Sequence, residues 1–309
     1  MKQLLIKIFL FLFTIVLLDQ LFGMGMEFAL KNTEKGDWGR NNYIFNEVNH
    51  DIIILGSSRA IHHYDPKIFA DTLGMSCYNC GEDGMGILLM YPRYRAIEAR
   101  KTPKVVIYEI LPEYDLLKEA DNLKYLKFLR PYTNSPVIDS LVNRLSKTEK
   151  YKLLSGGYRF NSVFVDILAQ RYSNASETAK DYTYMPSDQK LGYISQDRLN
   201  DLSQANSVHD FAYDDVKLDF LEDLMVRCTK SNTKLFVTAS PKFYSTSDSE
   251  FLSIKKLCVK YGVPFINHYC DKDYSMNSNL FADIYHLNKN GADIFSSQLA
   301  SEIKISIKE

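Results

Sequence analysis

The stretch DIIILGSSRA, from Asp51 to Ala60, decides the fold of this chain. Its four consecutive apolar residues, Ile52 to Leu55, are typical of a short strand that is buried on both faces, as in a parallel sheet. The strand runs directly into the turn Gly56-Ser57-Ser58-Arg59. The carboxyl ends of buried strands are where open α/β sheets carry their chemistry, so the two hydroxyls are candidates for a site. A tight turn with a serine helix cap would have the same sequence.

Strand and helix patterns alternate along the rest of the chain. Four further strands are predicted at residues 75–79, 105–110, 235–238 and 263–267. Helices are predicted at residues 65–73, 87–100, 137–145, 162–172, 216–228, 247–261 and 289–303. We expect the helix at 247–261 to begin with a capping box formed by Ser247 and Glu250. The alternation predicts an α/β fold, a flavodoxin-like three-layer sandwich with a five-stranded parallel sheet.

The chain divides into three predicted parts. Residues 1–26 are predicted to be a signal anchor or signal peptide, residues 27–50 a polar linker, and residues 51–309 the α/β domain. Strand patterns stop between residues 116 and 215. A structureless loop of this length is implausible in a compact domain, so these residues are predicted to be a mostly helical insertion. We expect the insertion either to govern the choice of acceptor or partner, or to be a protective lid.

The N-terminal segment carries an export signal. Lys2 and Lys7 precede an apolar run from Ile8 to Met26, interrupted at Asp19-Gln20. As a helix this run would be ~28 Å long, enough to span a membrane as an uncleaved anchor. The small-x-small pattern Gly23-Met24-Gly25 is instead typical of a cleavable signal. In both cases the lysines stay inside and the body of the chain is exported to the cell envelope, or secreted after cleavage.

Composition excludes some classes of partner. The 37 basic and 38 acidic residues give a formal charge of −1, so no long-range attraction to nucleic acid is expected. The five cysteines form no zinc-binding pattern, and we expect no metal and no cofactor. The pair Cys77 and Cys80 is either a redox pair or two small buried residues at a strand end.

Several candidate site residues follow the predicted strands: Ser57 and Ser58, Gly84, Glu113, and Asp283 with His286. Because the strand ends of a parallel sheet point one way, these residues can converge on one rim. Asp283 can hold one nitrogen of His286 while the other nitrogen faces a serine, the arrangement that activates a hydroxyl. Each residue also has a structural alternative, as a helix cap, a turn glycine or a packing histidine. The Gly-x-Ser-x-Gly elbow of another serine hydrolase fold is absent, since Ala60 stands at its last position.

In this order and spacing, the sequence resembles the SGNH (GDSL-type) hydrolase superfamily over roughly residues 51–309, apart from the insertion. GSSRA stands where the family has Gly-Asp-Ser, which implies that Ser58 is the nucleophile and that Ser57 replaces the family Asp. NCGEDG resembles the second block, which implies that the Gly84 N–H joins that of Ser58 in the oxyanion hole. DIYHLN resembles the Asp-x-x-His block, which implies that Asp283 and His286 complete a triad.

The third block departs from the family pattern. PKVVIYEILPEYD keeps the strand, but Glu113 occupies the position of the family's oxyanion Asn. An ionised carboxylate can only accept a hydrogen bond, so we expect Glu113 to turn away, toward Arg59, or to be held protonated. Arg59, His62 and His63 lie near the proposed site and could touch a substrate carboxylate or phosphate. The favoured alternative for these three residues is a solvated loop after the first strand.

The resemblance and the export signal together imply an exported serine esterase or O-acyltransferase that acts on acyl esters of a cell-envelope glycan through acyl-Ser58. The expected substrate is an acylated glycan or another envelope ester, and a membrane-bound acyltransferase is a candidate partner. The alternative is a non-catalytic envelope protein that retains the SGNH fold, motivated by Glu113 and Ser57. A nucleotide-binding domain is disfavoured, because GSSRA lacks the glycines that admit a pyrophosphate.

Overall fold

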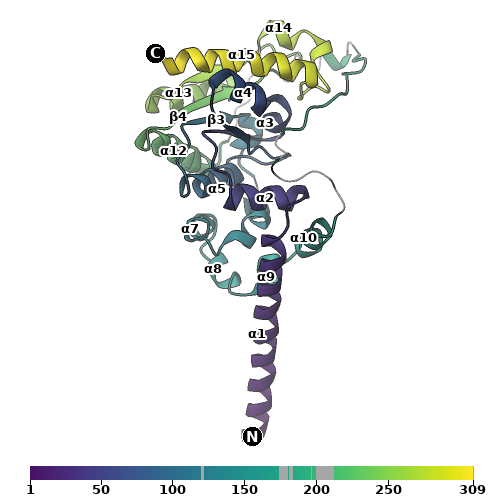
Figure 1. Ribbon diagram of the computed structural model, residues 1–309, viewed down its shortest axis with the longest axis vertical. Helices are drawn as coiled ribbons and strands as arrows, with labels where there is room; N and C mark the ends of the chain where they lie inside the picture. The colour runs from purple at the N-terminus through teal and green to yellow at the C-terminus, as the bar shows by residue number, and fades with distance from the viewer. Residues whose placement is uncertain (120–121, 174–179, 181–183, 196, 200–211, 309) are drawn as a thin grey trace. The chain divides into compact units, whose positions relative to one another are not determined.

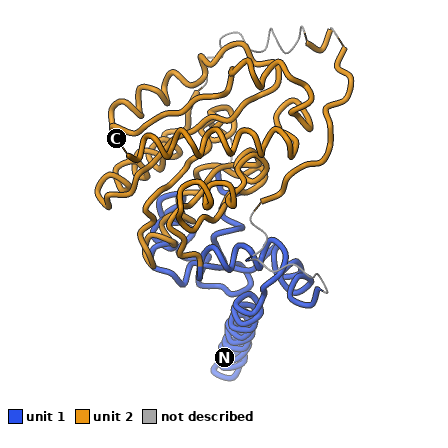
Figure 2. Tube along the Cα trace, turned by 45° about the horizontal axis from the view of Figure 1, so that its top comes forward, with its two compact units in different colours: residues 1–47, 121–182 blue, residues 48–120, 183–309 orange. Residues whose placement is uncertain are grey.

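The computed structural model describes residues 1–119, 122–173, 180, 184–195, 197–199 and 212–308 (Figure 1). Two compact units divide the chain (Figure 2). Unit 1 comprises residues 1–47 and 121–182, and unit 2 comprises residues 48–120 and 183–309. Parts of the predicted insertion, at residues 120–121, 174–179, 181–183, 196 and 200–211, lie outside the described residues.

A five-stranded parallel sheet forms the centre of unit 2. Its strands are β1 (Ile52–Leu55), β2 (Cys77–Asn79), β3 (Val105–Glu109), β4 (Lys234–Ala239) and β5 (Phe265–Asn267). They lie in the order β2-β1-β3-β4-β5, and Ile52 is in register with both Cys77 and Val105. This is the strand order of flavodoxin-like folds, whose topological switch point lies between β1 and β3. The predicted α/β fold class is confirmed.

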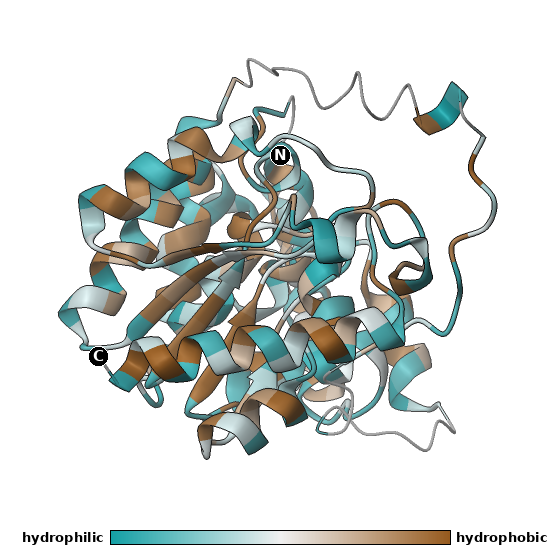
Figure 3. Ribbon diagram, turned by 90° about the horizontal axis from the view of Figure 1, so that it is seen from above, coloured by the Kyte–Doolittle hydropathy of each residue, from teal (hydrophilic) through white to brown (hydrophobic). Residues whose placement is uncertain are grey.

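Helices cover both faces of the sheet (Figures 1 and 3). They are α3 (Ser58–His63), α4 (Pro66–Leu73), α5 (Ile87–Glu98), α6 (Pro112–Asp115), α12 (Asp215–Lys230), α13 (Leu252–Tyr261), α14 (Lys272–Ser275) and α15 (Lys289–Lys308), with 3-10 turns η3 (Ser249–Phe251) and η4 (Ser278–Leu280). α4 begins and ends at the predicted residues. The Asp65 carboxylate accepts the N–H of Lys67 at 2.8 Å, and Gly74 ends the helix in the left-handed conformation with φ 67°.

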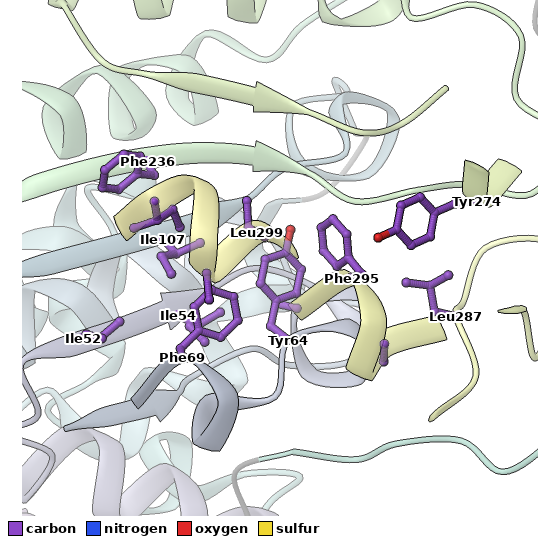
Figure 4. Close-up of a cluster of buried hydrophobic side chains, with 14 of the residues drawn as sticks. Ile52, Ile54, Tyr64, Phe69, Ile107, Phe236, Tyr274, Leu287, Phe295 and Leu299 are labelled. Carbon is purple, nitrogen blue, oxygen red and sulfur yellow. The ribbon is translucent and has the colours of Figure 1, made fainter. Parts of the chain in front are cut away.

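The main core lies between the sheet and helices α4 and α15 (Figure 4). Ile52 and Ile54 of β1 face Phe295 and Leu299 of α15, and all four side chains are fully buried. Because side chains alternate across a strand, the intervening residue Ile53 faces the opposite layer. There α5 and α12 pack together, with the ring centroids of Tyr91 and Phe220 5.2 Å apart.

Unit 1 is helical in its described residues. Its elements are α1 (Lys2–Lys31), α2 (Gly36–Asn46), η1 (Asn122–Phe128), η2 (Arg130–Tyr132), α7 (Pro136–Leu145), α8 (Glu149–Lys152), α9 (Gly156–Phe160) and α10 (Phe164–Arg171). By length and composition, α1 qualifies as a membrane-spanning helix, and no other helix in the described part of the chain does. Residues 122–173 of the predicted insertion therefore carry helices of their own.

Two local predictions are wrong. The predicted linker at residues 27–50 is largely helical, because α1 continues to Lys31 and α2 buries Trp38 and Phe45 despite its many polar residues. The capping box at Ser247 does not form. The Ser247 hydroxyl instead accepts the N–H of Ser249 at 3.3 Å in a local turn, and α13 begins only at Leu252. Serine competes in this way wherever a turn offers its backbone a nearer partner.

Gly291 in the first turn of α15 provides a test of the core packing. A Cβ at this position would lie 2.2 Å from the carbonyl oxygen of Leu280. Alanine normally stabilises a helix by ~1 kcal/mol relative to glycine. Here we expect the reverse, because relieving the overlap should cost about 1–3 kcal/mol. Urea unfolding of Gly291→Ala measures the change in the free energy of unfolding.

The matched control for this prediction is Ser301→Ala, an exposed position on the same helix. It should change the free energy of unfolding by less than about 0.5 kcal/mol. A Gly291→Ala variant that is as stable as the unaltered protein would contradict the close approach of α15 to Leu280.

Candidate active site

Ser58 lies at the carboxyl end of β1, as the first residue of α3. Its Oγ is 2.8 Å from Nε2 of His286. Ser57 is buried at the N-cap position, and its side chain makes no capping hydrogen bond. Gly56 permits the sharp turn before it, with φ 147° and a hypothetical Cβ only 2.8 Å from the Glu109 carbonyl oxygen. Of the two serines, Ser58 is therefore the one that reaches the histidine.

His286 and Asp283 lie in the loop between η4 and α15. Nδ1 of His286 is 2.9 Å from Oδ2 of Asp283. Oδ1 of Asp283 accepts the backbone N–H groups of Tyr285 at 2.7 Å and His286 at 2.8 Å. Partial burial alone would raise the pKa of Asp283, but the hydrogen bonds from His286 and Tyr285 outweigh it and lower that pKa. An ionised carboxylate therefore orients the imidazole, with Nδ1 as the donor.

The side chain of Asn288 closes this loop. Its amide donates to the carbonyl oxygens of Asn279 at 2.8 Å and Phe281 at 3.2 Å. Its own oxygen accepts the Gly291 N–H at 3.1 Å. Asn288 therefore ties both ends of the histidine loop to the start of α15.

The loop after β2 is anchored to the helix that carries Ser58. The Asn79 amide donates to the carbonyl oxygens of Ala60 at 2.7 Å and Tyr64 at 2.9 Å. The Glu82 N–H donates to the Gly56 carbonyl oxygen at 3.1 Å. Gly84 follows in this loop in the left-handed conformation, with φ 67° and open space where a Cβ would be. Asn79 is a site residue that the sequence reading missed, although it opens the NCGEDG block.

Glu113 lies in the first turn of α6, directly after β3. Its Oε1 is 3.6 Å from Nζ of Lys242, with both side chains largely buried. The predicted pairing of Glu113 with Arg59 is wrong. Nε of Arg59 instead donates to Glu109 Oε1 at 2.8 Å, and its Nη2 donates to the Ser240 carbonyl oxygen. Arg59 pairs with Glu109 and not with Glu113 because Glu109 ends β3 with its side chain inside the fold, where a buried guanidinium requires an anion.

Arg59, His62 and His63 do not lie in a solvated loop, so that prediction is also wrong. All three belong to α3, and Arg59 and His63 are almost fully buried. Arg59 is therefore unavailable to a substrate carboxylate or phosphate. Helix α3 has only 6 residues, too few for its buried face to be recognised from the sequence.

His62 lies beside the catalytic candidate His286, with ring centroids 5.4 Å apart. Its Nε2 is 3.2 Å from Oδ1 of Asp83, and its Nδ1 contacts the carbonyl oxygen of Met185. Burial would lower the pKa of His62, but these two hydrogen bonds outweigh burial and raise it. His62 is thus a candidate cation at one edge of the site.

His63 holds the loop that carries Asp283 and His286 through a hydrogen bond to its backbone. Its Nε2 accepts the N–H of Leu287 at 3.0 Å, and its Nδ1 is 2.8 Å from the Ser240 hydroxyl, which in turn lies 3.2 Å from Glu109 Oε1. Burial and the nearby Arg59 charge hold the pKa of His63 well below its ordinary value. Because its partner Ser240 is 177 residues away in the chain, no sequence pattern marks His63.

Metal ligation has no candidate among the residues that the structure describes. No group of three or more His, Cys, Asp and Glu side chains is arranged there to hold an ion.

Comparisons with known proteins add little to this geometry. No protein-family model matches the sequence, and no curated protein matches it. Among solved structures, the chain is similar to a "putative acylhydrolase" from Bacteroides fragilis NCTC 9343. The TM-score is 0.37 at 10% identity, over 82% of this chain and 87% of that chain. A likeness this slight carries no argument, so membership of the SGNH superfamily stays a prediction.

The buried position of His63 predicts a pH dependence of stability. The folded protein keeps His63 neutral, whereas the unfolded chain binds a proton to it below about pH 6.5. The unfolded state therefore holds more protons, and the stability from this group is lost as the pH falls below that value. The slope is at most ~1.4 kcal/mol per pH unit.

The variant His63→Gln lacks the titratable imidazole, so this pH-dependent contribution to stability is absent from it. Its disadvantage in the free energy of unfolding, relative to the unaltered protein, should shrink between about pH 7.5 and pH 5.5. Urea titrations of both proteins across this range measure the difference. Parallel curves would show that His63 takes up a proton in the folded protein as readily as in the unfolded chain, which would contradict its burial as a neutral group.

Proposed function

We propose that this protein is an exported serine esterase or O-acyltransferase that works through an acyl-Ser58 intermediate. The observation that carries the proposal is the continuous contact from Ser58 Oγ to His286 Nε2 and from His286 Nδ1 to Asp283. As Oγ attacks an ester carbonyl, Nε2 of His286 takes its proton. Asp283 keeps the imidazole in the required tautomer and stabilises the imidazolium that forms.

Two backbone donors are proposed for the oxyanion. Ser58 begins α3, and the N–H groups of a first helical turn have no acceptor within the helix. Gly84 supplies the second N–H from the loop anchored to the same helix. Glu113 supplies no third donor when ionised, because a carboxylate only accepts. Its ion pair with Lys242 favours a role away from the hole.

The reaction then proceeds in two steps. The tetrahedral intermediate collapses, the alcohol leaves with the proton held on His286, and the acyl group remains on Ser58. A second nucleophile gives its proton to His286 and takes the acyl group, and His286 returns that proton to Ser58 Oγ as the ester bond to Ser58 breaks. Water makes the protein an esterase, and a sugar hydroxyl makes it a transferase.

An acylated envelope glycan is the proposed substrate class. Lys2 and Lys7 at the N-terminal end of the apolar helix α1 favour export. The side chains of His286 and Asp283 are 26% and 56% exposed, so a polymer chain can approach the triad without entering a deep pocket. A membrane-bound acyltransferase is the proposed acyl donor if the second step is transfer.

The identity of the nucleophile tests this proposal. Ser58→Ala should abolish labelling by a fluorophosphonate probe and activity on p-nitrophenyl acetate, because Ser58 is the serine whose hydroxyl lies within hydrogen-bond distance of His286. The matched variant Ser57→Ala should retain much of both. Loss of labelling in Ser57→Ala alone would refute the triad. An unaltered protein that never labels would support the alternative, a non-catalytic envelope protein that retains the fold.

The pair Glu113–Lys242 gives a second test. Glu113→Asn would restore a side-chain donor, and one such donor typically contributes ~10²–10³ in turnover. We therefore expect faster turnover of an aryl acetate at neutral pH. Lys242→Met should slow turnover, because an unpaired Glu113 carboxylate would repel the developing oxyanion.

The double variant serves as the control for this pair. Glu113→Asn combined with Lys242→Met should behave like Glu113→Asn alone, since Lys242 then has no carboxylate to hold. A loss of activity in Glu113→Asn would mean that Glu113 has a positive role, such as binding the acceptor.

A further inference from the structure

Helix α1 has a free half and a packed half. The residues from Lys2 to Leu18 are all exposed, whereas Gly23, Met26, Ala29 and Leu30 are buried within unit 1. Figure 1 shows the N-terminal half projecting alone and α9 and α10 lying beside the C-terminal half.

Asp19 marks the boundary between these halves. Its carboxylate accepts the N–H groups of Gly156 at 2.9 Å and Gly157 at 2.8 Å, and the hydroxyl of Ser155 at 2.8 Å. These are the unsatisfied donors at the start of α9, so Asp19 caps that helix from another part of the chain. A Cβ at Gly156 would lie 2.7 Å from the Cα of Gly23. The backbones of α1 and α9 are therefore in contact.

This packing distinguishes the two predictions for the N-terminal segment. Cleavage after Gly25 would remove both Asp19 and Gly23, leaving α9 uncapped and one of its faces open. It would also leave Glu27, whose carboxylate pairs with Arg159 of α9, at a new chain end. A retained helix keeps all three contacts, so the geometry favours an anchor.

The free half is too short to cross a bilayer alone. Even counted from Leu4 to Leu18, it spans ~23 Å, whereas the hydrocarbon core is ~30 Å thick. The shortfall of ~7 Å corresponds to about five residues of helix. The outer edge of the hydrocarbon must therefore reach the level of Asp19 to Gly23, where α9 already packs. Asp19 is tolerated there because its oxygens are occupied by donors.

Unit 1 exposes apolar side chains near this level. We call them the collar: Leu21, Phe22, Leu154, Phe164, Val165 and Leu168. Phe22 and Phe164 touch edge to face with ring centroids 6.0 Å apart. The Gln20 amide donates to the Leu154 carbonyl oxygen at 2.8 Å, which holds that loop against α1. Soluble surfaces rarely expose apolar side chains in such continuity.

Basic side chains that contact aromatic rings also occur in unit 1, on the helices that carry or adjoin the collar. Lys150 lies 4.9 Å from the ring centroid of Tyr151, and Arg171 lies 5.4 Å and 5.7 Å from those of Phe28 and Tyr172. Tyr151 and Tyr172 are both largely exposed. Exposed tyrosines beside long basic side chains are typical of the headgroup layer.

We propose that the collar of unit 1 is inserted into the outer boundary of the bilayer that a retained α1 spans. The bilayer is favoured over a protein partner, because the collar continues the exposed apolar surface of α1 and is flanked by interface-type residues. This inference rests on the proposed membrane anchor but not on the proposed catalytic activity.

Tryptophan fluorescence tests the collar in the full-length protein. Trp38 is the single tryptophan, so Trp38→Phe provides a dark background. On this background, Leu154→Trp and Val165→Trp are each reconstituted into phosphatidylcholine–phosphatidylglycerol liposomes that contain brominated lipids. Both should lose most of their emission to bromines near the headgroups and shift to shorter wavelength.

Two further variants make the result specific. Leu12→Trp, in the free half of α1, should be quenched by deep bromines. Asp166→Trp, adjacent to Val165 but turned ~100° around α10, should be quenched much less than Val165→Trp. Equal quenching at Val165 and Asp166, or no quenching at Leu154 and Val165, would overturn the proposal that the collar is inserted into the bilayer.

The same sample tests the proposed anchor and the proposed activity independently of each other. If Leu12→Trp is not quenched, or if intact mass shows that residues 1–25 are removed from the exported chain, the anchor fails and the collar fails with it. Fluorophosphonate labelling of Ser58 is measured in parallel, and its outcome decides the catalytic proposal independently.

Discussion

The buried ion pair between Arg59 and Glu109 is the constraint on which the site depends. Adjacent residues of α3 face opposite ways: Ser58 turns outward to His286, and Arg59 turns inward to the last residue of β3. Removing one partner of a buried pair typically costs 3–5 kcal/mol, since the other charge is left uncompensated. The orientation of Ser58 is therefore fixed by a charge that cannot leave the interior.

The same interior network reaches the histidine loop. Glu109 also lies within hydrogen-bond distance of the Ser240 hydroxyl, which contacts His63, which in turn accepts the Leu287 N–H. One buried carboxylate is thus connected to the residue after Ser58 and to the residue after His286. Ser58 and His286, which exchange a proton in the proposed mechanism, are thus supported by the same buried network, and such support holds two groups within the narrow geometry that proton transfer requires.

The sequence predicted the fold because buried parallel strands appear as continuous apolar runs, and because Asp65-Pro66 and Gly74 mark the ends of α4. It predicted that Ser58, Asp283 and His286 would meet, because strand ends of a parallel sheet share one rim. It failed at Arg59 and His63, whose roles depend on partners 50 and 177 residues away. It failed at α2 because its polar residues are buried by long-range packing that composition does not reveal.

The cap that Asp19 places on α9 joins residues 137 positions apart. Residues 48–120, which carry the first three strands, are synthesised between the two halves of unit 1. Unit 1 therefore cannot complete its packing until those strands have emerged, and closing so long a loop is slow. During that interval the Asp19 carboxylate lacks the donors that α9 later supplies. Assembly of this protein is thus ordered in time: β1 to β3 emerge before the helical unit can close, whereas β4 and β5 emerge only after its last residue.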